Sequence, residues 1–265
     1  MKRCDKAVTP NQPEMNFMKF VVTKLLFASL ISFTINTWAK SPDWTDYAEV
    51  LKQVKSGLKH ETPLALVDYG ELKQSGQLEK AYRLISQFPV DSLETRDEKL
   101  AFYINTYNIL ALKMVADHWP LESIKDVGSL FRPVWGKTAG IIGGKKVSLN
   151  DIEHEMIRPM GEPRIHMAIV CASVSCPDLR TEPYTAEKLN LQLDDQAKLF
   201  LSNDKKGLWV GSKAIHASKI FDWFEEDFSK EGGVKSFIRQ YRPDLPDLDI
   251  DADIDYDWSV NGVTR

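Results

Sequence analysis

Hydrophobic residues recur every three or four positions in two stretches that follow residue 40. This spacing is typical of amphipathic helices and predicts one helix over residues 44–54 and a second over residues 79–87. Turn-forming sequences, Asp68-Tyr69-Gly70 and Ser75-Gly76, lie between them. We therefore expect residues 40–89 to form a helical cover that carries no functional residues of its own.

A longer hydrophobic stretch begins after Thr95-Arg-Asp-Glu98, which has the sequence of a helix capping box. The predicted helix continues to His118 and ends before Pro120. Because it is apolar on nearly all sides, we expect it to be the buried central helix. Asn105 and Asn108 are polar exceptions that share one face of it.

A buried amide without partners costs about 1 to 3 kcal/mol, so both asparagines are expected to have hydrogen-bond partners. In one interpretation they tether a loop or the end of a strand. In the other, Asn105 orients a catalytic imidazole or donates to an oxyanion.

Three stretches predict strands. Gly143-Gly144 is a typical hairpin turn within residues 141–147. Residues 208–210 and 213–216 predict a second hairpin. Between residues 247 and 258, Asp alternates with apolar residues, which predicts a half-buried edge strand whose outward acids discourage pairing with another chain.

Further helices are predicted after residue 148. Ser148-Leu-Asn-Asp151 is a second capping sequence, for a helix that ends at Pro159. His154 and Arg158 share a face of this helix, where His154 is either an exposed, ion-paired residue or part of a site. The other helices are expected over residues 185–200, capped by Thr185, over residues 220–228, and from Gly233 to Tyr241.

The segment 164–180 is the main candidate for chemistry. Its apolar run, Ile165–Val170, predicts a buried strand that carries His166. Cys171 and Cys176 follow in a loop of small residues, and α/β folds often place functional residues on loops just after a strand. Together these elements predict a mixed α/β (α+β) single domain, with a small, mostly antiparallel sheet against the buried central helix and surrounding helices.

The composition supports a globular domain and excludes one class of partner. The chain has 265 residues, 43% of them hydrophobic, and a formal net charge of −4. It has no cluster of Lys and Arg and no basic stripe interleaved with aromatic residues, so we do not expect nucleic-acid binding.

The N-terminal region has the pattern of a secretory signal. Residues 18–39 begin with basic residues, continue with an apolar run over residues 25–35 and end with small residues at Thr37 and Ala39. Cleavage is expected after Ala39, which predicts a periplasmic or secreted protein. The apolar run is short for a membrane span, so no stable span is expected after cleavage, and an uncleaved anchor is the alternative.

The predicted cleavage removes Cys4 and leaves Cys171 and Cys176, which an oxidising compartment allows to pair. Closing so short a loop would stabilise the fold by only about 2 kcal/mol. Stability alone is therefore a weak reason for the bridge.

Several of these motifs together resemble the uncharacterised family called domain of unknown function 547 (DUF547). The motifs are Phe102-Tyr-Ile-Asn-Thr-Tyr-Asn108, Asp151-Ile-Glu-His154, His166-Met-Ala-Ile-Val-Cys-Ala-Ser-Val-Ser-Cys-Pro177, Phe221-Asp-Trp-Phe-Glu-Glu-Asp-Phe228 and Tyr256-Asp-Trp-Ser-Val-Asn261. The resemblance implies a single α/β-type domain over residues 90–261. The sequence patterns described above place before it a signal peptide with an upstream extension (1–39) and the helical cover (40–89). The resemblance implies no reaction.

Three hypotheses for function remain open. We favour a non-catalytic domain that binds an unknown small molecule or protein and uses the cysteine pair structurally. The second is a thiol-dependent hydrolase or transferase in which His166 activates Cys176 or Cys171 and Asn105 orients the imidazole. In either case the predicted binding residues are Tyr107, Asn108, His154 and Arg158.

The third hypothesis is a metal site made by His154, His166, Cys171 and Cys176. Their spacing is looser than the usual zinc patterns, so neither a metal nor a cofactor is our prediction. An EF-hand loop counted from Asp249 puts Ile254 where Gly is required. A dithiol redox motif is also disfavoured, because four residues separate the cysteines where two are usual.

Overall fold

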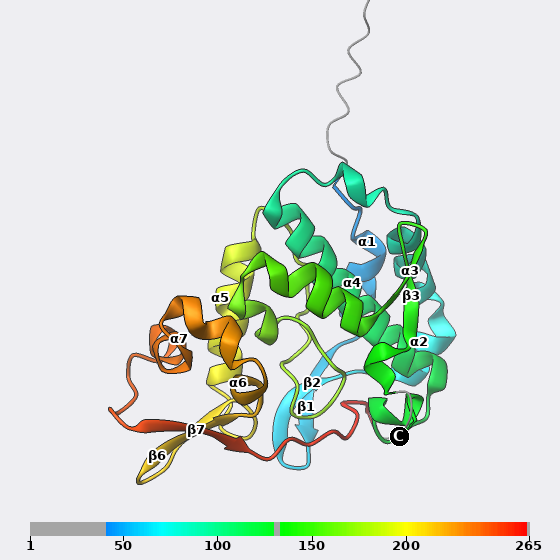
Figure 1. Ribbon diagram of the computed structural model, residues 1–265. Helices are drawn as coiled ribbons and strands as arrows, with labels where there is room; N and C mark the ends of the chain where they lie inside the picture. The colour runs from blue at the N-terminus through cyan, green and yellow to red at the C-terminus, as the bar shows by residue number, and fades with distance from the viewer. Residues whose placement is uncertain (1–40, 130–132, 264–265) are drawn as a thin grey trace, which may run out of the picture. The chain divides into compact units, whose positions relative to one another are not determined.

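A 23-residue helix, α4 (Arg96–His118), forms the centre of the main hydrophobic core. Thr95 accepts a hydrogen bond from the backbone of Glu98, and the Glu98 side chain accepts one from the backbone of Thr95, so the predicted capping box is present. The computed structural model describes residues 41–129 and 133–263 (Figure 1), which lie in one compact unit. The predicted signal segment lies outside the described residues.

Residues 45–87 form three helices, two of which pack against α4, and a hairpin that the sequence pattern did not predict. The helices are α1 (Thr45–Leu51), α2 (Tyr69–Ser75) and α3 (Gln77–Gln87). Between α1 and α2, strands β1 (Lys55–Lys59) and β2 (Thr62–Leu66) pair antiparallel. Their two turn residues, His60 and Glu61, have φ values of 47° and 60°. Turns of this kind usually contain Gly or Asn, so the usual hairpin signal is missing from the sequence.

A second hairpin, β3 (Thr138–Ile142) and β4 (Lys145–Ser148), lies against α3 and α4. Gly143 and Gly144 form its turn with positive φ values, as predicted. The chain then enters a π-helix, η4 (Asp151–Ile157), and a short 3-10 helix, η5 (Arg158–Met160). The helix predicted here is therefore present, although it is more loosely wound than an α-helix.

The remaining strands form a three-stranded sheet with a core of its own (Figure 1). Strand β5 (Leu208–Val210) pairs antiparallel with β6 (Ala214–Ser218), and β7 (Asp249–Ile254) pairs with the other side of β6 in parallel. The second core contains Phe221, Phe228 and Phe237. It joins this sheet to the helices α5 (Leu189–Leu201), α6 (Ile220–Trp223) and α7 (Val234–Tyr241).

The fold is the predicted mixed α/β single domain, with three small sheets in place of one. As predicted, β7 is an edge strand whose Asp residues point to solvent. Helix α5 starts four residues after Thr185, and a 3-10 helix, η7 (Glu225–Glu231), replaces the second half of the helix predicted over residues 220–228.

The prediction that His166 lies on a strand is wrong. Residues Pro163–Met167 form a 3-10 helix, η6, which packs against α5. Pro163 stands at the start of this helix, and the Glu162 side chain accepts a hydrogen bond from the backbone of Arg164. The apolar run is buried as predicted, but a run of this length does not distinguish a strand from a buried helical turn.

Candidate functional site

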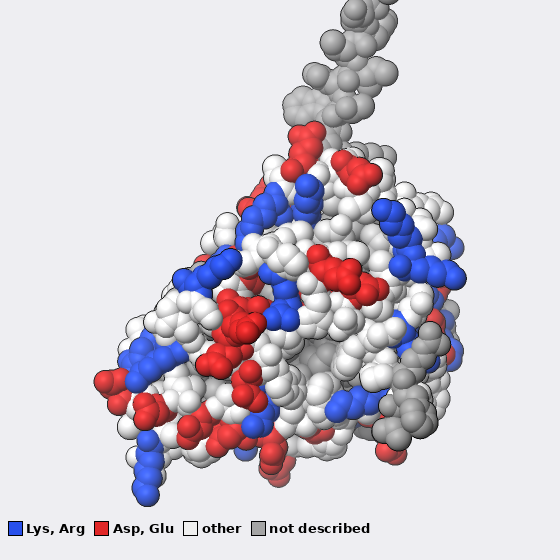
Figure 2. Space-filling model, viewed as in Figure 1, with Lys and Arg blue, Asp and Glu red and all other residues white. Residues whose placement is uncertain are grey.

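A pocket of about 240 Å³ lies where α4, η4, α6 and the cysteine loop meet. Five of the predicted site residues line it, namely Tyr107, His154, His166, Cys171 and Cys176. Figure 2 shows the hollow in this face of the molecule, with Asp and Glu side chains gathered on the side where α6 lies. Asn105, Asn108 and Arg158 are not in its lining.

His166 belongs to a network of charged groups at the edge of the pocket. Its Nε2 donates to Oδ2 of Asp227 over 2.7 Å. Arg158 donates to both carboxylate oxygens of Asp227, over 2.6 and 2.9 Å, and its Nη1 donates to Nδ1 of His154 over 2.7 Å. The imidazole is thus oriented by Asp227, a role that one of our two interpretations gave to Asn105.

Burial sets the charge of this network. It lowers the pKa of His166 and outweighs the opposing effect of Asp227, so the imidazole is neutral at pH 7. Burial also opposes ionisation of Asp227, but hydrogen bonds from His166 and Arg158 outweigh it and lower the pKa of the carboxyl well below its usual range. The Nδ1 atom of His166 is buried and has no hydrogen-bond partner among the described residues.

Glu153 is a site residue that the sequence did not single out. Its side chain lines the pocket, and the only hydrogen bond it receives within the described chain comes from the Tyr107 hydroxyl, at 3.4 Å. Burial raises the pKa of its carboxyl to about 7, although Arg158 and Tyr107 act in the opposite direction. Glu153 and Asp227 both lie inside motifs of the predicted family resemblance, which was the signal that could have identified them.

Aromatic rings form much of the pocket wall. Trp223, Tyr256 and Trp258 pack on one another, with ring centroids 4.5 to 5.7 Å apart, and Trp135 lies 6.1 Å from Trp258. Phe224 stacks on the imidazole of His166 at 4.1 Å. Trp135, from the short helix that precedes β3, is also part of the lining.

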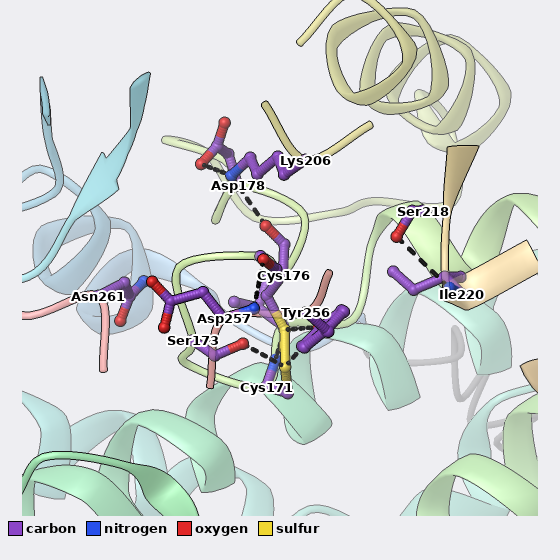
Figure 3. The surroundings of a disulfide bond; sticks show 12 residues. Cys171, Ser173, Cys176, Asp178, Lys206, Ser218, Ile220, Tyr256, Asp257 and Asn261 are labelled. Atoms are coloured by element: carbon purple, nitrogen blue, oxygen red, sulfur yellow. Dashed lines mark hydrogen bonds and ion pairs between the residues drawn. A yellow bond between two sulfur atoms is a disulfide. The ribbon is translucent and has the colours of Figure 1, made fainter. Parts of the chain in front are cut away.

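The two cysteines form a disulfide bond (Figure 3). The Tyr256 hydroxyl lies 3.2 Å from Sγ of Cys171 and 3.3 Å from Sγ of Cys176, and the backbone N–H of Cys171 donates to Sγ of Cys176 over 2.8 Å. Beyond the bridge, the buried ammonium of Lys206 donates to the Cys176 carbonyl and to Asp178. The loop is thereby fixed from both sides.

The two asparagines of α4 hold backbone segments. The Asn105 amide exchanges hydrogen bonds with the backbone C=O and N–H of Tyr184, at 2.8 and 2.9 Å. The Asn108 amide donates to the Ala168 carbonyl and accepts from the backbone N–H of Val170, at 3.0 and 2.8 Å. Asn108 thus fixes the segment that leads from His166 into the cysteine loop.

The described part of the chain shows no arrangement suited to a metal. No group of three or more His, Cys, Asp or Glu side chains within residues 41–129 and 133–263 is placed to hold an ion. The bridge also engages both sulfur atoms that the metal hypothesis required. In the same ranges, no helix combines the length and apolar character needed to cross a membrane.

Comparison with known proteins identifies part of the chain. Residues 90–201 match the family model described as "Protein of unknown function, DUF547". This match confirms the resemblance for that region, whereas Asp227, Tyr256 and Trp258 come from motifs that follow it. No curated protein and no solved structure is similar enough to the chain to count as a match.

Proposed function

We propose that this protein is exported and binds a small organic molecule in the pocket between Tyr107 and Trp258. The observation that carries this proposal is a small cavity with a largely aromatic wall that also contains Glu153 and His166. Ligand sites of this kind combine an apolar wall with a few polar groups that fix orientation. The cavity is smaller than the usual 300 to 1,000 Å³ of such sites, so the ligand is a small one.

The disulfide has a structural role in this proposal. It joins the two ends of the loop that follows His166 and presents its sulfur atoms to the Tyr256 hydroxyl. This holds the ring of Tyr256 at the pocket wall. A pair that forms a stable bridge agrees with export, because disulfides persist in oxidising compartments.

A matched pair of tryptophans provides the test. Trp223 lines the pocket and is 45% exposed, whereas Trp209 lies on β5, away from the pocket, and is 41% exposed. A panel of small amines, sugars, alcohols and carboxylic acids is screened by the shift in melting temperature of the full chain. We expect a binder whose shift is lost in Trp223→Ala and kept in Trp209→Ala. A panel without any binder, or binding equally affected by both changes, would contradict the proposal.

Export is tested separately, by fractionation of the producing cells and N-terminal sequencing of the recovered protein. We expect the protein outside the cytoplasm, beginning at Lys40, because cleavage is predicted after Ala39. A protein that keeps its N-terminal residues and stays in the cytoplasmic fraction would contradict this part of the proposal. Ligand binding would be unaffected by that result.

A thiol-dependent hydrolase or transferase is the second candidate, and one specific observation favours it. Asp227 orients His166, whose Nδ1 has no partner, and His166 shares the pocket with both cysteines. Reduction of the bridge would place a thiol near a neutral imidazole, which is the arrangement that activates a nucleophile. After reduction, this candidate predicts rapid alkylation of one cysteine by iodoacetamide, and His166→Ala slows it. Equal alkylation rates in both proteins would exclude it.

A further inference from the structure

We infer that the pocket binds a small organic cation, either a protonated amine or a quaternary ammonium ion. This inference rests on the proposed function and specifies its ligand class. Three observations of different kinds carry it: the aromatic wall, a carboxyl group that no described residue pairs with, and acidic residues beside the pocket.

The aromatic wall has the composition of a cation site. The ring faces of Trp, Tyr and Phe attract cations, and Trp does so most strongly. Four such rings, those of Trp135, Trp223, Tyr256 and Trp258, pack as neighbours in the wall. The chain itself places a cation on this cluster, because the ammonium of Lys125 lies 3.5 Å from the ring centroid of Trp258. Lys125 is not part of the pocket lining, so its contact leaves the pocket itself open.

Glu153 is a carboxyl group that has no cationic partner within residues 41–129 and 133–263. No Lys, Arg or His of the described chain lies within ion-pair distance of it. Arg158 is the cation whose charge acts on it most strongly, and that guanidinium is engaged by Asp227 and His154. A buried carboxylate is costly unless it is paired, so a ligand cation would supply what the protein does not.

The charges around the pocket also favour a cation. Asp222, Glu225 and Glu226 are exposed on α6 and η7, and Figure 2 shows acidic side chains on this side of the hollow. Such a cluster attracts cations to the opening. Among the described residues of the lining, an anionic ligand would find no available positive group, since His154 and His166 both have lowered pKa values, chiefly because of burial.

The decisive comparison uses two probes of nearly equal shape, choline and its uncharged analogue 3,3-dimethylbutan-1-ol. Binding to the full chain is measured by titration calorimetry at pH 8, with glucose as a neutral polar control. We expect choline to bind at least about tenfold more tightly than the analogue, since the attraction between a cation and aromatic ring faces is strongest in a desolvated site. Lys125→Met should tighten choline binding and leave the analogue unchanged, because it removes a like charge beside Trp258.

The pH profile tests the role of Glu153. Burial raises the pKa of Glu153 to about 7, so its carboxyl is mostly protonated at pH 6 and mostly ionised at pH 8. Choline should therefore bind about tenfold more tightly at pH 8 than at pH 6. His154, His166, Tyr107 and Tyr256 also face this region, so Glu153→Gln is the control, and it should flatten the profile. A profile that persists in Glu153→Gln would overturn the role of this carboxyl.

The outcomes separate this inference from the proposed function. Equal binding of choline and its analogue would overturn the cation inference and leave a ligand-binding pocket. Preference for glucose, lost in Trp223→Ala, would also overturn it and indicate a sugar site. If no probe and no member of the broader panel binds, both the inference and the proposed function fail.

Discussion

The imidazole of His166 lies 2.7 Å from the carboxylate of Asp227, although 61 residues separate the two along the chain. Arg158 binds the same carboxylate through two hydrogen bonds. One side chain thus connects the 3-10 helix η6, the end of the π-helix η4 and the segment that follows α6. This relationship orders one edge of the pocket.

Asp227→Asn should destabilise the protein by about 2 kcal/mol at pH 7, because it removes the charge that pairs with Arg158 and His166 in a partly buried site. The pKa of Asp227 is lowered in the folded state, so its stabilisation is present above the ordinary Asp pKa of about 4 and is lost as the pH falls through and below that value. Urea denaturation at pH 7 and pH 3 checks both statements. Asp222→Asn, an exposed acid on the same segment, should change the stability by less than about 0.5 kcal/mol.

Glu153→Gln should stabilise the protein above pH 7. Burial raises the pKa of Glu153 to about 7, so the folded state binds the proton more tightly than the unfolded state does. Its relative stability therefore falls as the pH rises from about 4.5 to about 7, and Gln removes this dependence. Urea denaturation should show that the stability of the Gln variant relative to the wild type increases by about 2 to 3 kcal/mol between pH 5 and pH 8. The exposed Glu155, changed to Gln, should show no such growth.

The disulfide should contribute about 2 kcal/mol to stability, as expected for so short a loop. Urea denaturation with and without reductant should show this loss in the wild type, whereas a double variant, Cys171→Ser and Cys176→Ser, should be insensitive to reductant. Thiol titration of the denatured, unreduced chain should detect one thiol, from Cys4, in the full chain and none in a chain that begins at Lys40. Two additional thiols in either form would show that the bridge is absent.

Asn108→Ala should cost about 2 to 4 kcal/mol, because the N–H of Val170 and the C=O of Ala168 would remain buried without their partner. Thr106→Val on the same helix is the matched control. The Thr106 hydroxyl is buried and has no partner among the described residues, so Val should be neutral or stabilising. Thermal or urea denaturation of both variants checks the contrast, and similar losses in both would contradict the tethering role of Asn108.

Local signals in the sequence predicted local structure well. Helix α4 was predicted with its capping box, because the cap and the helical repeat are encoded within the residues that form them. The Gly143-Gly144 hairpin was predicted for the same reason. The β1–β2 hairpin was missed, because His60 and Glu61 adopt positive φ values without a glycine to indicate them.

The contacts between side chains in the pocket could not be predicted from the sequence pattern. The predicted residues His166, Cys171 and Cys176 line one pocket, and the two cysteines form a disulfide. However, which side chain meets His166 depends on how the two cores pack together, and an amide such as Asn105 and a carboxylate such as Asp227 are both chemically able to orient an imidazole. Glu153 could not be singled out from the sequence either, because its raised pKa comes from burial that only the folded chain creates.

The pocket joins Tyr107 on α4 to Trp258 beyond β7. During synthesis, 151 residues must be added after Tyr107 before the ring of Trp258 exists, so the pocket wall cannot be complete until nearly the whole chain has been made. A fragment that ends before residue 258 would therefore contain the central helix but lack part of the wall that we propose for a ligand.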